Sequence, residues 1–326
     1  MIGMIVRRLA LLPVLLVVIY TLTFVLAWSL PGEAVLNDEG RQPPAEVLAA
    51  MKAQYNLDDP GAFYWQYLGN VSGVRWVTET LRGGAGQPPA YVFDFGPSFR
   101  YEDWSVNELV GASLPVSVVL GLGAILIALV IGLLAGAVGA VRPNSLADLA
   151  TLSLALVGIS LPTFVIGTGL LMVFPVWLGI GSVGGWGRLS DMVLPAVTLS
   201  LPFAAYIARL TRVGMIDALG SDYVRTARAK GAPASVVVLR HALRNAFLPV
   251  LSYLGPACAF AMTGSFVVER VFNVPGIGQH FVNAVKNKDL FVIMGVTLIY
   301  SAMLIVLNLI VDVLYRWVDP RIEAGS

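Results

Sequence analysis

Six long runs without Asp, Glu, Lys or Arg place this chain in a membrane. A helix needs about 20 mostly apolar residues to cross the hydrocarbon core of a bilayer. Only helices and closed barrels satisfy the backbone in lipid, and these runs lack the two-residue alternation of barrel strands. We therefore expect an all-α integral membrane protein with six transmembrane helices. The runs are Leu9–Gly32, Leu109–Val141, Leu149–Gly187, Met192–Ala208, Asn245–Val268 and Leu290–Val311.

Three of these runs need comment. The fourth is short, but it extends to about Gly214 if the side chain of Arg209 snorkels towards the interface. The third ends in a glycine-rich stretch, Gly179–Gly187, which is typical of a loop. The first follows Arg7 and Arg8, as a cleaved signal peptide would, but it is longer than the usual signal core of 7–15 residues. We therefore interpret it as a retained helix.

Composition and missing motifs exclude several classes of function. Only 13% of the residues are charged, whereas a soluble domain usually carries about 25%. The single cysteine, Cys258, excludes a disulfide framework and is interpreted as a small buried residue. No phosphate-binding loop is present, because none of the four lysines follows a glycine, and no Gly-x-Ser-x-Gly motif occurs. We expect no catalytic, cofactor-binding or metal-binding residues, and no ATP hydrolysis by this chain alone.

Basic residues set the expected orientation, because they concentrate in the short cytoplasmic loops of membrane proteins. Placing the N-terminus in the cytoplasm puts most of the Arg and Lys residues inside, including the block from Arg209 to Arg244. Six spans then bring both termini to the cytoplasmic side. In this topology His241 and His280 lie on opposite sides of the membrane and cannot share one metal site.

A polar segment of about 80 residues separates the first two spans and is expected outside the cell. It contains turn sequences at Pro43-Pro44, Asp59-Pro60-Gly61, Gly83-Gly84 and Pro88-Pro89. It is too apolar for a disordered linker, and we expect a small folded cap; the alternative is that its aromatic residues only rest at the membrane interface. These aromatic residues include Tyr64, Trp65, Tyr67, Trp76, Phe93, Phe95 and Trp104.

A second polar segment, residues 216–246, lies inside and is basic. It favours helix, with breaks at Gly220, Gly231 and Pro233. Its apolar residues recur at roughly helical spacing from Val236 to Phe247. Such a helix could lie on anionic lipid or dock into a groove of a soluble partner. Its basic charge and apolar spacing fit both alternatives equally well.

The same segment carries the motif that identifies a family. Residues Asp222–Gly231, with Leu239–Pro249 after them, resemble the cytoplasmic coupling motif of ABC-importer permeases, most closely the peptide-permease branch. In that family a short helix, a glycine turn and a second helix dock into a cleft of the ATPase subunit. Many importers begin the motif with Glu-Ala-Ala, whereas Arg225-Thr226-Ala227 stands here, as is usual in the peptide branch.

Further stretches extend the resemblance over nearly the whole chain. They include Ile5–Arg8, Asn56–Pro60, Asp94–Phe99, Gly158–Phe164, Val274–Gly278 and Val318–Ile322. Residues Phe99–Leu109 and Pro249–Ala257 are most similar to the B subunits of oligopeptide permeases. The resemblance implies a type I importer fold with an N-terminal transmembrane helix (1–30), an extracytoplasmic cap region (31–110) and a five-helix permease core (111–326) that contains the coupling segment.

The resemblance also implies a function and partners. The chain would be one half of the pore of an ATP-driven oligopeptide importer in the bacterial cytoplasmic membrane. A second homologous permease, two ATPase subunits that use ATP and Mg²⁺, and an extracytoplasmic peptide-binding protein would complete it. A dipeptide or nickel-type metal-chelate permease is the alternative on the same scaffold. A proton-coupled carrier is another, but the spans contain few deep ionisable residues; Glu269 and Asp312 lie at predicted span ends.

Two groups of residues are candidates for function. The resemblance assigns ATPase coupling to the segment around Gly231, and the aromatic residues of the cap are a hypothesis for docking the binding protein. The polar residues at membrane depth either face the substrate pathway or bond to a neighbouring helix. The coupling candidates are Tyr223, Arg225, Thr226, Ala227, Gly231, Arg240, His241, Leu243 and Arg244, and the pathway candidates are Ser160, Thr163, Thr263, Ser265 and Asn308.

Overall fold

The computed structural model describes residues 2–31, 45–82, 90–99, 104–263 and 265–318. Helices make up the regular structure of these residues, and one isolated β-bridge joins Pro97 and Ser105. Several sequence features lie outside the described residues: Pro43-Pro44, Gly83-Gly84, Pro88-Pro89 and most of the C-terminal stretch Val318–Ile322.

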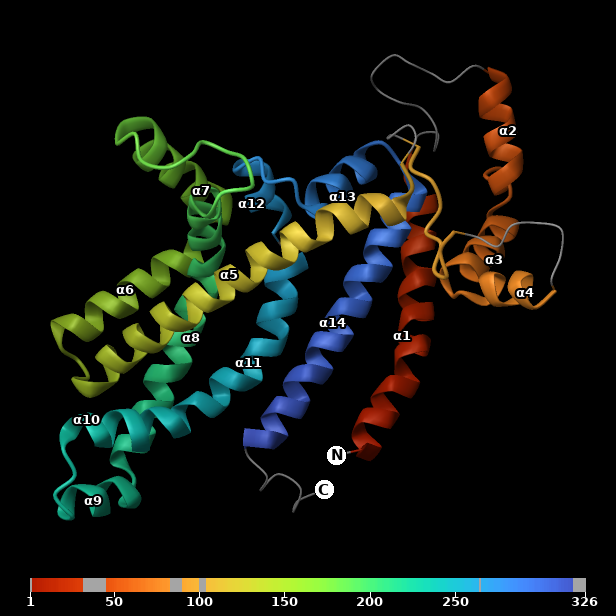
Figure 1. Ribbon diagram of the computed structural model, residues 1–326. Coiled ribbons are helices and arrows are strands. Elements are labelled where there is room, and N and C mark those ends of the chain that lie inside the picture. Colours follow the sequence, from red (N-terminus) through yellow and green to blue (C-terminus); the bar gives the residue numbers. More distant parts are fainter. Residues whose placement is uncertain (1, 32–44, 83–89, 100–103, 264, 319–326) are drawn as a thin grey trace. The chain divides into compact units, whose positions relative to one another are not determined.

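Figure 1 shows the helices in their order along the chain; the longest connections precede α2, α5 and α8. Two of them are π-helical turns, η1 and η2, which continue the α-helices before them. The bounds are α1 Ile2–Trp28, α2 Ala45–Tyr55, α3 Pro60–Val71, α4 Val74–Arg82, α5 Val106–Val141, α6 Leu146–Ser160, α7 Thr163–Leu171, η1 Met172–Trp177, α8 Leu189–Gly220, α9 Asp222–Ala229, α10 Ala234–Val236, η2 Val237–Ala242, α11 Leu243–Thr263, α12 Phe266–Val271, α13 Ile277–Lys286 and α14 Leu290–Val318.

Long apolar helices confirm the expected membrane fold. Five are long and apolar enough to cross a membrane: α1, α5, α8, the run from α10 to α12, and α14. The pair α6 and α7, extended by η1, passes the same test together. Counting this pair as one span gives the six spans predicted from the sequence, and all of them are helical.

Two of the predicted spans differ from the structure in detail. The third is not straight, because α6 and α7 meet at a bend of 104°. Leu161 is extended there (φ −88°, ψ 133°), as expected for a residue that precedes a proline, and Pro162 cannot continue the helix. The fourth is not short, because α8 continues through Arg209 and Arg212 to Gly220. Charged residues ended the apolar run in the sequence, but they did not end the helix.

The chain forms two compact units. The first contains residues 1–5, 116–275 and 304–326, and the second contains residues 6–115 and 276–303. This grouping follows spatial contacts, whereas the predicted division at residues 30 and 110 follows the order of spans and remains a prediction.

Small residues let the helices of the first unit approach closely. A Cβ added at Gly136 of α5 would lie 2.5 Å from the carbonyl oxygen of Ala208 and 2.6 Å from Cβ of Thr211. Gly214 of α8 faces Ala246 of α11 in the same way. A Cβ added at Gly214 would lie 3.0 Å from the Cα of Ala246. Close approach through glycine is typical of membrane helices, which cannot rely on the hydrophobic effect for association.

Aromatic rings hold the second unit together. Phe291 of α14 lies 5.1–5.5 Å, between ring centroids, from Tyr55, Phe63, Tyr67 and Phe99. Tyr20, Phe24 and Trp28 of α1 pack against α3 through Phe63, Tyr64 and Tyr67. We call these rings the aromatic cluster: Tyr20, Phe24, Trp28, Tyr55, Phe63, Tyr64, Tyr67, Phe99 and Phe291.

Hydrogen bonds complete the packing of the region between the first two spans. The hydroxyl of Tyr67 donates to the carbonyl of Phe95 (3.3 Å), and burial raises its pKa well above the usual value, so that it remains a donor. The buried carboxylate of Asp289 accepts from Ser98 Oγ (2.8 Å) and from the Phe99 N–H (3.0 Å). This region is therefore a folded part of the second unit, although Trp65 remains 70% exposed.

Candidate functional site

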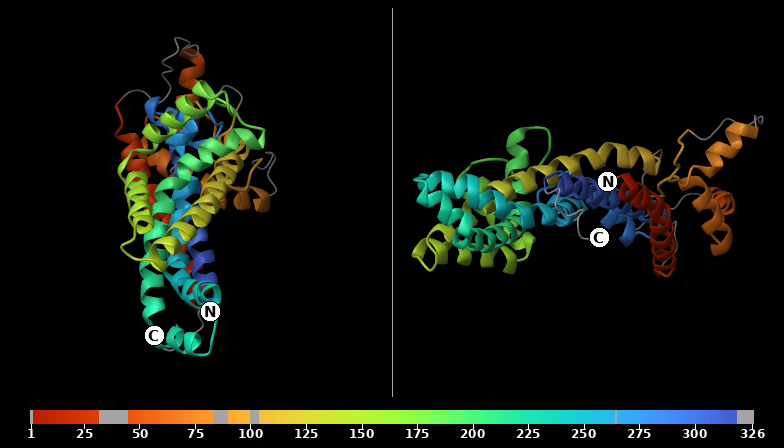
Figure 2. Two further views of the ribbon diagram at one scale, coloured as in Figure 1. Left: turned by 90° about the vertical axis from the view of Figure 1, so that its left-hand side faces the viewer. Right: turned by 90° about the horizontal axis from the view of Figure 1, so that it is seen from below.

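The predicted coupling segment, residues 216–246, forms two helical arms joined by a turn. It begins in the last turn of α8, and Ser221 separates α8 from α9. The second arm runs without interruption through α10 and η2 into α11. Figures 1 and 2 show α9 at the opposite end of α8 from α7. The structure thus has the local form that the resemblance implied: a short helix, a glycine turn and a second helix.

Gly231 makes the turn possible. Its φ of +79° lies in the left-handed region, where residues with a side chain are strained. Its N–H donates to Arg228 (2.9 Å), and the next N–H, of Ala232, donates to Ala227 (3.1 Å), so that the end of α9 is capped. A Cβ at this position would meet nothing within 4 Å. The backbone conformation, and not lack of space, therefore requires glycine here.

Small buried residues anchor both arms to the rest of the first unit. Ala242 and Ala246 of the second arm pack against Met215 and Ala218 of α8, together with Ala140 of α5. We call these five residues the alanine cluster. Val224 of α9 and Val237 of η2 are also buried. Movement of the arms would therefore be transmitted directly to α8 and α5.

The outer face of the segment carries most of the predicted coupling residues. Hydrogen bonds across it are few: the Asn245 amide donates to the Tyr223 hydroxyl (2.7 Å), and Arg225 makes an exposed ion pair with Asp222 at 3.4 Å. Exposed pairs of this kind contribute less than about 1 kcal/mol. Tyr223, Arg225, Thr226, Gly231, Arg240 and Arg244 are exposed, and Ala227, His241 and Leu243 are partly buried.

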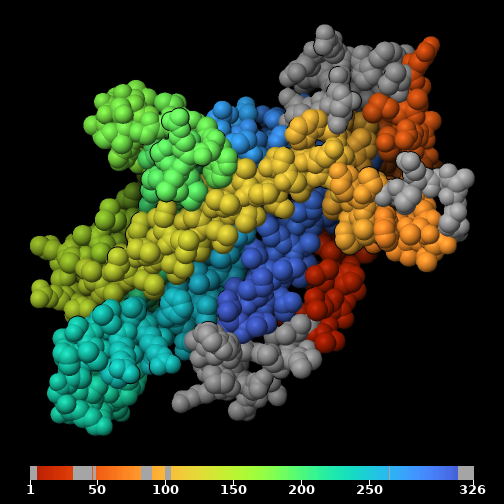
Figure 3. Space-filling view, in the orientation of Figure 1, coloured from red at the N-terminus to blue at the C-terminus, as the bar shows by residue number. Residues whose placement is uncertain are grey.

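The apolar residues of the second arm divide between two surroundings. Their roughly helical spacing in the sequence predicts one apolar face, which could lie on lipid or dock into a partner. In the structure Val237 is buried and Leu243 packs against the alanine cluster, whereas Leu239 is 64% exposed. The accessible face of the segment is therefore mostly basic, with Tyr223 and Leu239 as its exposed large hydrophobic side chains. Figure 3 shows this end of the first unit standing out from the surface.

An ion pair that the sequence did not predict ties α6 to α8. Asp148 is 1% exposed, and both of its oxygens accept from Arg212: Nε to Oδ1 at 2.6 Å and Nη2 to Oδ2 at 2.7 Å. The Asn144 N–H donates to Oδ2 as well (2.8 Å). A bidentate pair of this kind fixes orientation as well as charge. It links the connection between α5 and α6 to α8, which leads into the coupling segment.

An apolar groove of about 400 Å³ lies among α7, α8 and α11. Thr163, which begins α7 after the bend, contributes to its lining, as do Tyr253 and Phe260 of α11. Two lining prolines, Pro202 and Pro256, each leave a backbone carbonyl without its usual partner in the helix. Irregular backbone at membrane depth is tolerated where it is buried in protein or lines a water-filled cavity. The groove itself offers aromatic surface and the side chain of Thr163.

The other predicted pathway residues lie in different surroundings. Ser160 is exposed at the end of α6, on the other side of the bend from Thr163. Thr263 donates to the carbonyl of Ala259 in its own helix (2.9 Å). Asn308 of α14 packs against Gly255 of α11. A Cβ added at Gly255 would lie 3.1 Å from Oδ1 of Asn308. The structure brings only Thr163 of the predicted set to the lining of this groove.

Ser265 belongs to a buried network that the sequence did not predict. Its hydroxyl and that of Ser117 both lie 2.6 Å from Oε1 of Glu269, and all three residues are completely buried. Glu269 stood at a predicted span end, but nothing in the sequence pairs it with Ser117, which is 152 positions away. Buried carboxylates need such donors, because an unpaired charge inside a protein is costly.

The described residues offer no site for a bound metal. They contain no group of three or more His, Cys, Asp or Glu side chains that could hold one. Cys258 is partly buried and packs against the apolar core of the first unit.

Two family descriptions match the chain and together cover almost all of it. Residues 128–324 match the family described as binding-protein-dependent transport system inner membrane component. Residues 1–121 match the description of the N-terminal part of the same kind of membrane component.

Curated proteins match along nearly the full length. The oligopeptide transport system permease protein OppB of Salmonella typhimurium is 43% identical over 327 residues, which cover 99% of this chain and 100% of that protein. OppB of Haemophilus influenzae is 40% identical over 97% of both chains. The dipeptide transport system permease protein DppB of Bacillus subtilis is 40% identical over 94% of both chains.

Proposed function

The chain belongs to the family of binding-protein-dependent transport system inner membrane components, and from this premise we propose that it imports oligopeptides. As a member of that family it is a multi-pass inner-membrane protein and the pore-forming permease subunit of an ABC importer. Oligopeptide permeases match the chain from end to end, which supports this substrate class. A dipeptide permease is the second candidate, because such a protein is similar over almost the same length.

Members of this family work with ATPase and substrate-binding partners. We propose that a second homologous permease completes the pore and that two ATPase subunits bind ATP and Mg²⁺. This chain would then bind no cofactor and hydrolyse no ATP alone. The absence of a phosphate-binding loop from its sequence supports this division of labour.

Both termini lie on the cytoplasmic side in this proposal. Six spans and the basic block from Arg209 to Arg244 support it, because Arg and Lys concentrate in cytoplasmic loops. The coupling segment then faces the ATPases. The helical region between the first two spans faces the peptide-binding protein, and exposed Trp65 is a candidate contact on it.

The coupling segment transmits ATPase closure to the helices. This part of the proposal rests on the exposed segment at the end of α8, in which a glycine turn joins α9 to the second arm. ATP binding closes the ATPase pair and moves both arms, and the alanine cluster transfers that motion to α8. The helices rock from inward-facing to outward-facing, and hydrolysis resets them. Such a segment is the two-state element that coupling between distant sites requires.

The groove among α7, α8 and α11 is the proposed contribution of this subunit to the peptide pathway. Its aromatic lining can contact side chains of different kinds. Thr163 adds a hydroxyl at the bend. None of the described residues that line the groove is charged, which suits a carrier that accepts varied peptides.

Two measurements test the proposed function. Affinity purification of the tagged chain in mild detergent should bring down ATPase subunits and a second permease. Uptake by the purified complex in proteoliposomes, with its binding protein, should then be competed more strongly by peptides of several residues than by dipeptides. Stronger competition by dipeptides would favour the second candidate, and uptake driven by a proton gradient without ATP would contradict the proposal.

A further inference from the structure

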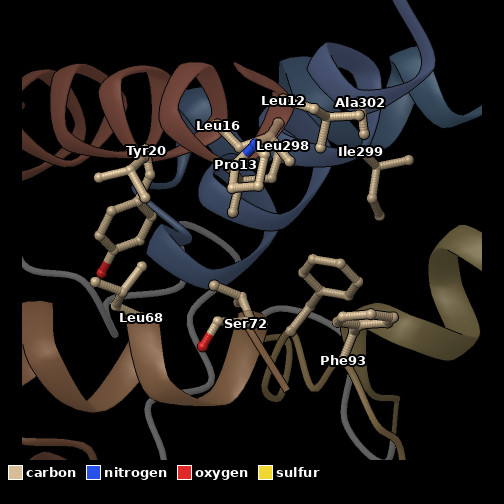
Figure 4. A pocket seen from close by; sticks show the side chains of 13 residues that line it. Leu12, Pro13, Leu16, Tyr20, Leu68, Ser72, Phe93, Leu298, Ile299 and Ala302 are labelled. Carbon is tan, nitrogen blue, oxygen red and sulfur yellow. The ribbon is translucent and has the colours of Figure 1, made fainter. Parts of the chain in front are cut away.

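A second apolar groove, of about 410 Å³, lies within the second unit among α1, α3 and α14 (Figure 4). Leu12 and Leu16 of α1 form one wall, beside Ile299 and Ala302 of α14. The figure shows Leu68 and Ser72 of α3, with Phe93, across the open space from them.

Hydroxyl groups at this groove already have partners. Tyr20 donates to the carbonyl of Tyr64 (2.6 Å), and Ser72 donates to the carbonyl of Gly69 (3.3 Å). A polar ligand would lose its hydrogen bonds to water and could regain few from these mostly apolar walls, which costs free energy. The walls therefore fit a hydrocarbon chain.

Hydrocarbon is also the medium on this side of α1. The most apolar window of α1 is only 6% buried in the protein, whereas that of α14 is 44% buried. A groove beside an exposed membrane span is open to the acyl chains of the bilayer. Its volume falls in the range of about 300–1,000 Å³ that is usual for small-molecule pockets.

The positive charges of Arg7 and Arg8 at the start of α1 favour an anionic lipid over a zwitterionic one. Arg8, Leu12, Leu16 and Tyr20 are spaced four residues apart, so that they share one face of the helix. Arg7 precedes this stripe, and both arginines are exposed. Arg8 and Leu16 are separated by about 12 Å along the axis, which fits within half of the hydrocarbon core, about 15 Å. An arginine has five N–H donors, so that it can bind a phosphate alongside a protein partner.

We propose that this groove binds one anionic phospholipid. Its phosphate lies at Arg7 and Arg8, and one acyl chain follows the stripe from Leu12 into the groove. The chain fills the space between α1, α3 and α14 and thereby joins the first span to the helical region that follows it. A zwitterionic phospholipid fits the groove equally well but is attracted less, because it lacks the net negative charge.

Native mass spectrometry of the intact complex tests the proposal. The complex is equilibrated in nanodiscs of equal phosphatidylglycerol and phosphatidylcholine, released in mild detergent, and the retained lipids are counted. We expect one retained phosphatidylglycerol. Leu16→Trp and Ala302→Phe, which fill the groove from α1 and from α14, should each lose it. Arg7→Gln and Arg8→Gln should each lower the preference for phosphatidylglycerol by about fivefold.

Val18→Trp is the matched control, because Val18 is 50% exposed on the other face of α1. It should retain the lipid as the unchanged protein does, and the same spectrum shows whether each variant remains assembled. The proposal is overturned if the unchanged protein retains no phosphatidylglycerol, or if both groove-filling variants retain as much as the control. Loss of the second permease from the groove-filling variants, with no lipid in the unchanged complex, would also overturn it and assign the groove to a partner helix.

Discussion

The coupling segment and the aromatic cluster are both built from helices, but different side chains hold them. The aromatic cluster joins α1, α3 and α14 through large rings in stacked, tilted and edge-to-face contacts, each pair of which contributes about 0.5–1.5 kcal/mol beyond area burial. The coupling segment is anchored by alanines and one methionine, and its outer face is basic and exposed. Large interlocked side chains suit a region that stays fixed, and small contacts suit one that shifts against its neighbours. Substitutions should therefore affect stability in the first region and coupling in the second.

Phe291→Ala should have the largest effect on stability. Phe291 is 2% exposed and contacts four rings of the aromatic cluster, so that its removal leaves a cavity. We expect destabilisation of about 3–5 kcal/mol, measured as a large fall in the melting temperature of the purified complex. Trp65→Ala is the control, because Trp65 is 70% exposed and its loss should change stability by less than about 0.5 kcal/mol. Equal melting temperatures for both variants would contradict the role of the cluster.

Asp148→Asn should destabilise the first unit, because it leaves the partly buried guanidinium of Arg212 without its counter-charge. The double variant Asp148→Asn with Arg212→Gln removes both charges and should recover much of the loss. Thermal melting of the two variants beside the unchanged protein checks this prediction. A single variant as stable as the double one would show that the ion pair contributes nothing.

Leu239→Ala should change stability by less than about 0.5 kcal/mol but reduce transport. Leu239 is 64% exposed on the face that we assign to the ATPase, so that its loss removes a docking contact without opening a cavity. Uptake per ATP hydrolysed, measured in proteoliposomes, should fall several-fold. Leu189→Ala, at the other end of α8 and 80% exposed, should leave uptake unchanged. Equal behaviour of the two variants would count against the docking face.

Trp65→Ala tests the proposed contact between the second unit and the peptide-binding protein. It should not alter basal ATPase activity, but it should weaken stimulation by the peptide-binding protein if exposed aromatic residues form that contact. This substitution is a cleaner test than deleting the region between the first two spans, because Phe63 and Tyr67 belong to the aromatic cluster and a deletion would remove them. Unchanged stimulation would remove Trp65 from the proposed contact.

Local signals in the sequence predicted the parts of the fold that depend on one segment. Apolar runs located the spans, and Gly231 marked the turn, because only glycine readily adopts a φ of +79°. The bend of 104° in the third run was not predicted, although Pro162 stands where the helix breaks. The apolar run that predicts the fourth span stops before Arg209, whereas α8 continues to Gly220. A charged residue ends an apolar run whether or not the helix continues.

Polar contacts between residues far apart in the chain could not be predicted from the sequence. Asp148 and Arg212 were both placed on the inner side, but their pairing across 64 positions depends on how α6 packs on α8. Glu269 and its serine partners are a similar case. The pathway candidates were chosen only as polar residues at membrane depth, and that criterion cannot distinguish Thr163, in a groove, from Ser265, in a buried network.

Gly231→Val tests most directly whether the coupling segment links transport to ATP. The β-branched side chain strains the turn but meets no neighbour, so that the complex should still assemble. Gly220→Val is the matched control, since a Cβ there also meets nothing and the backbone is not left-handed. Peptide uptake and ATP hydrolysis are measured in the same proteoliposomes. We predict that uptake per ATP falls by roughly tenfold or more for Gly231→Val and stays normal for the control; normal uptake per ATP in Gly231→Val would contradict the coupling role.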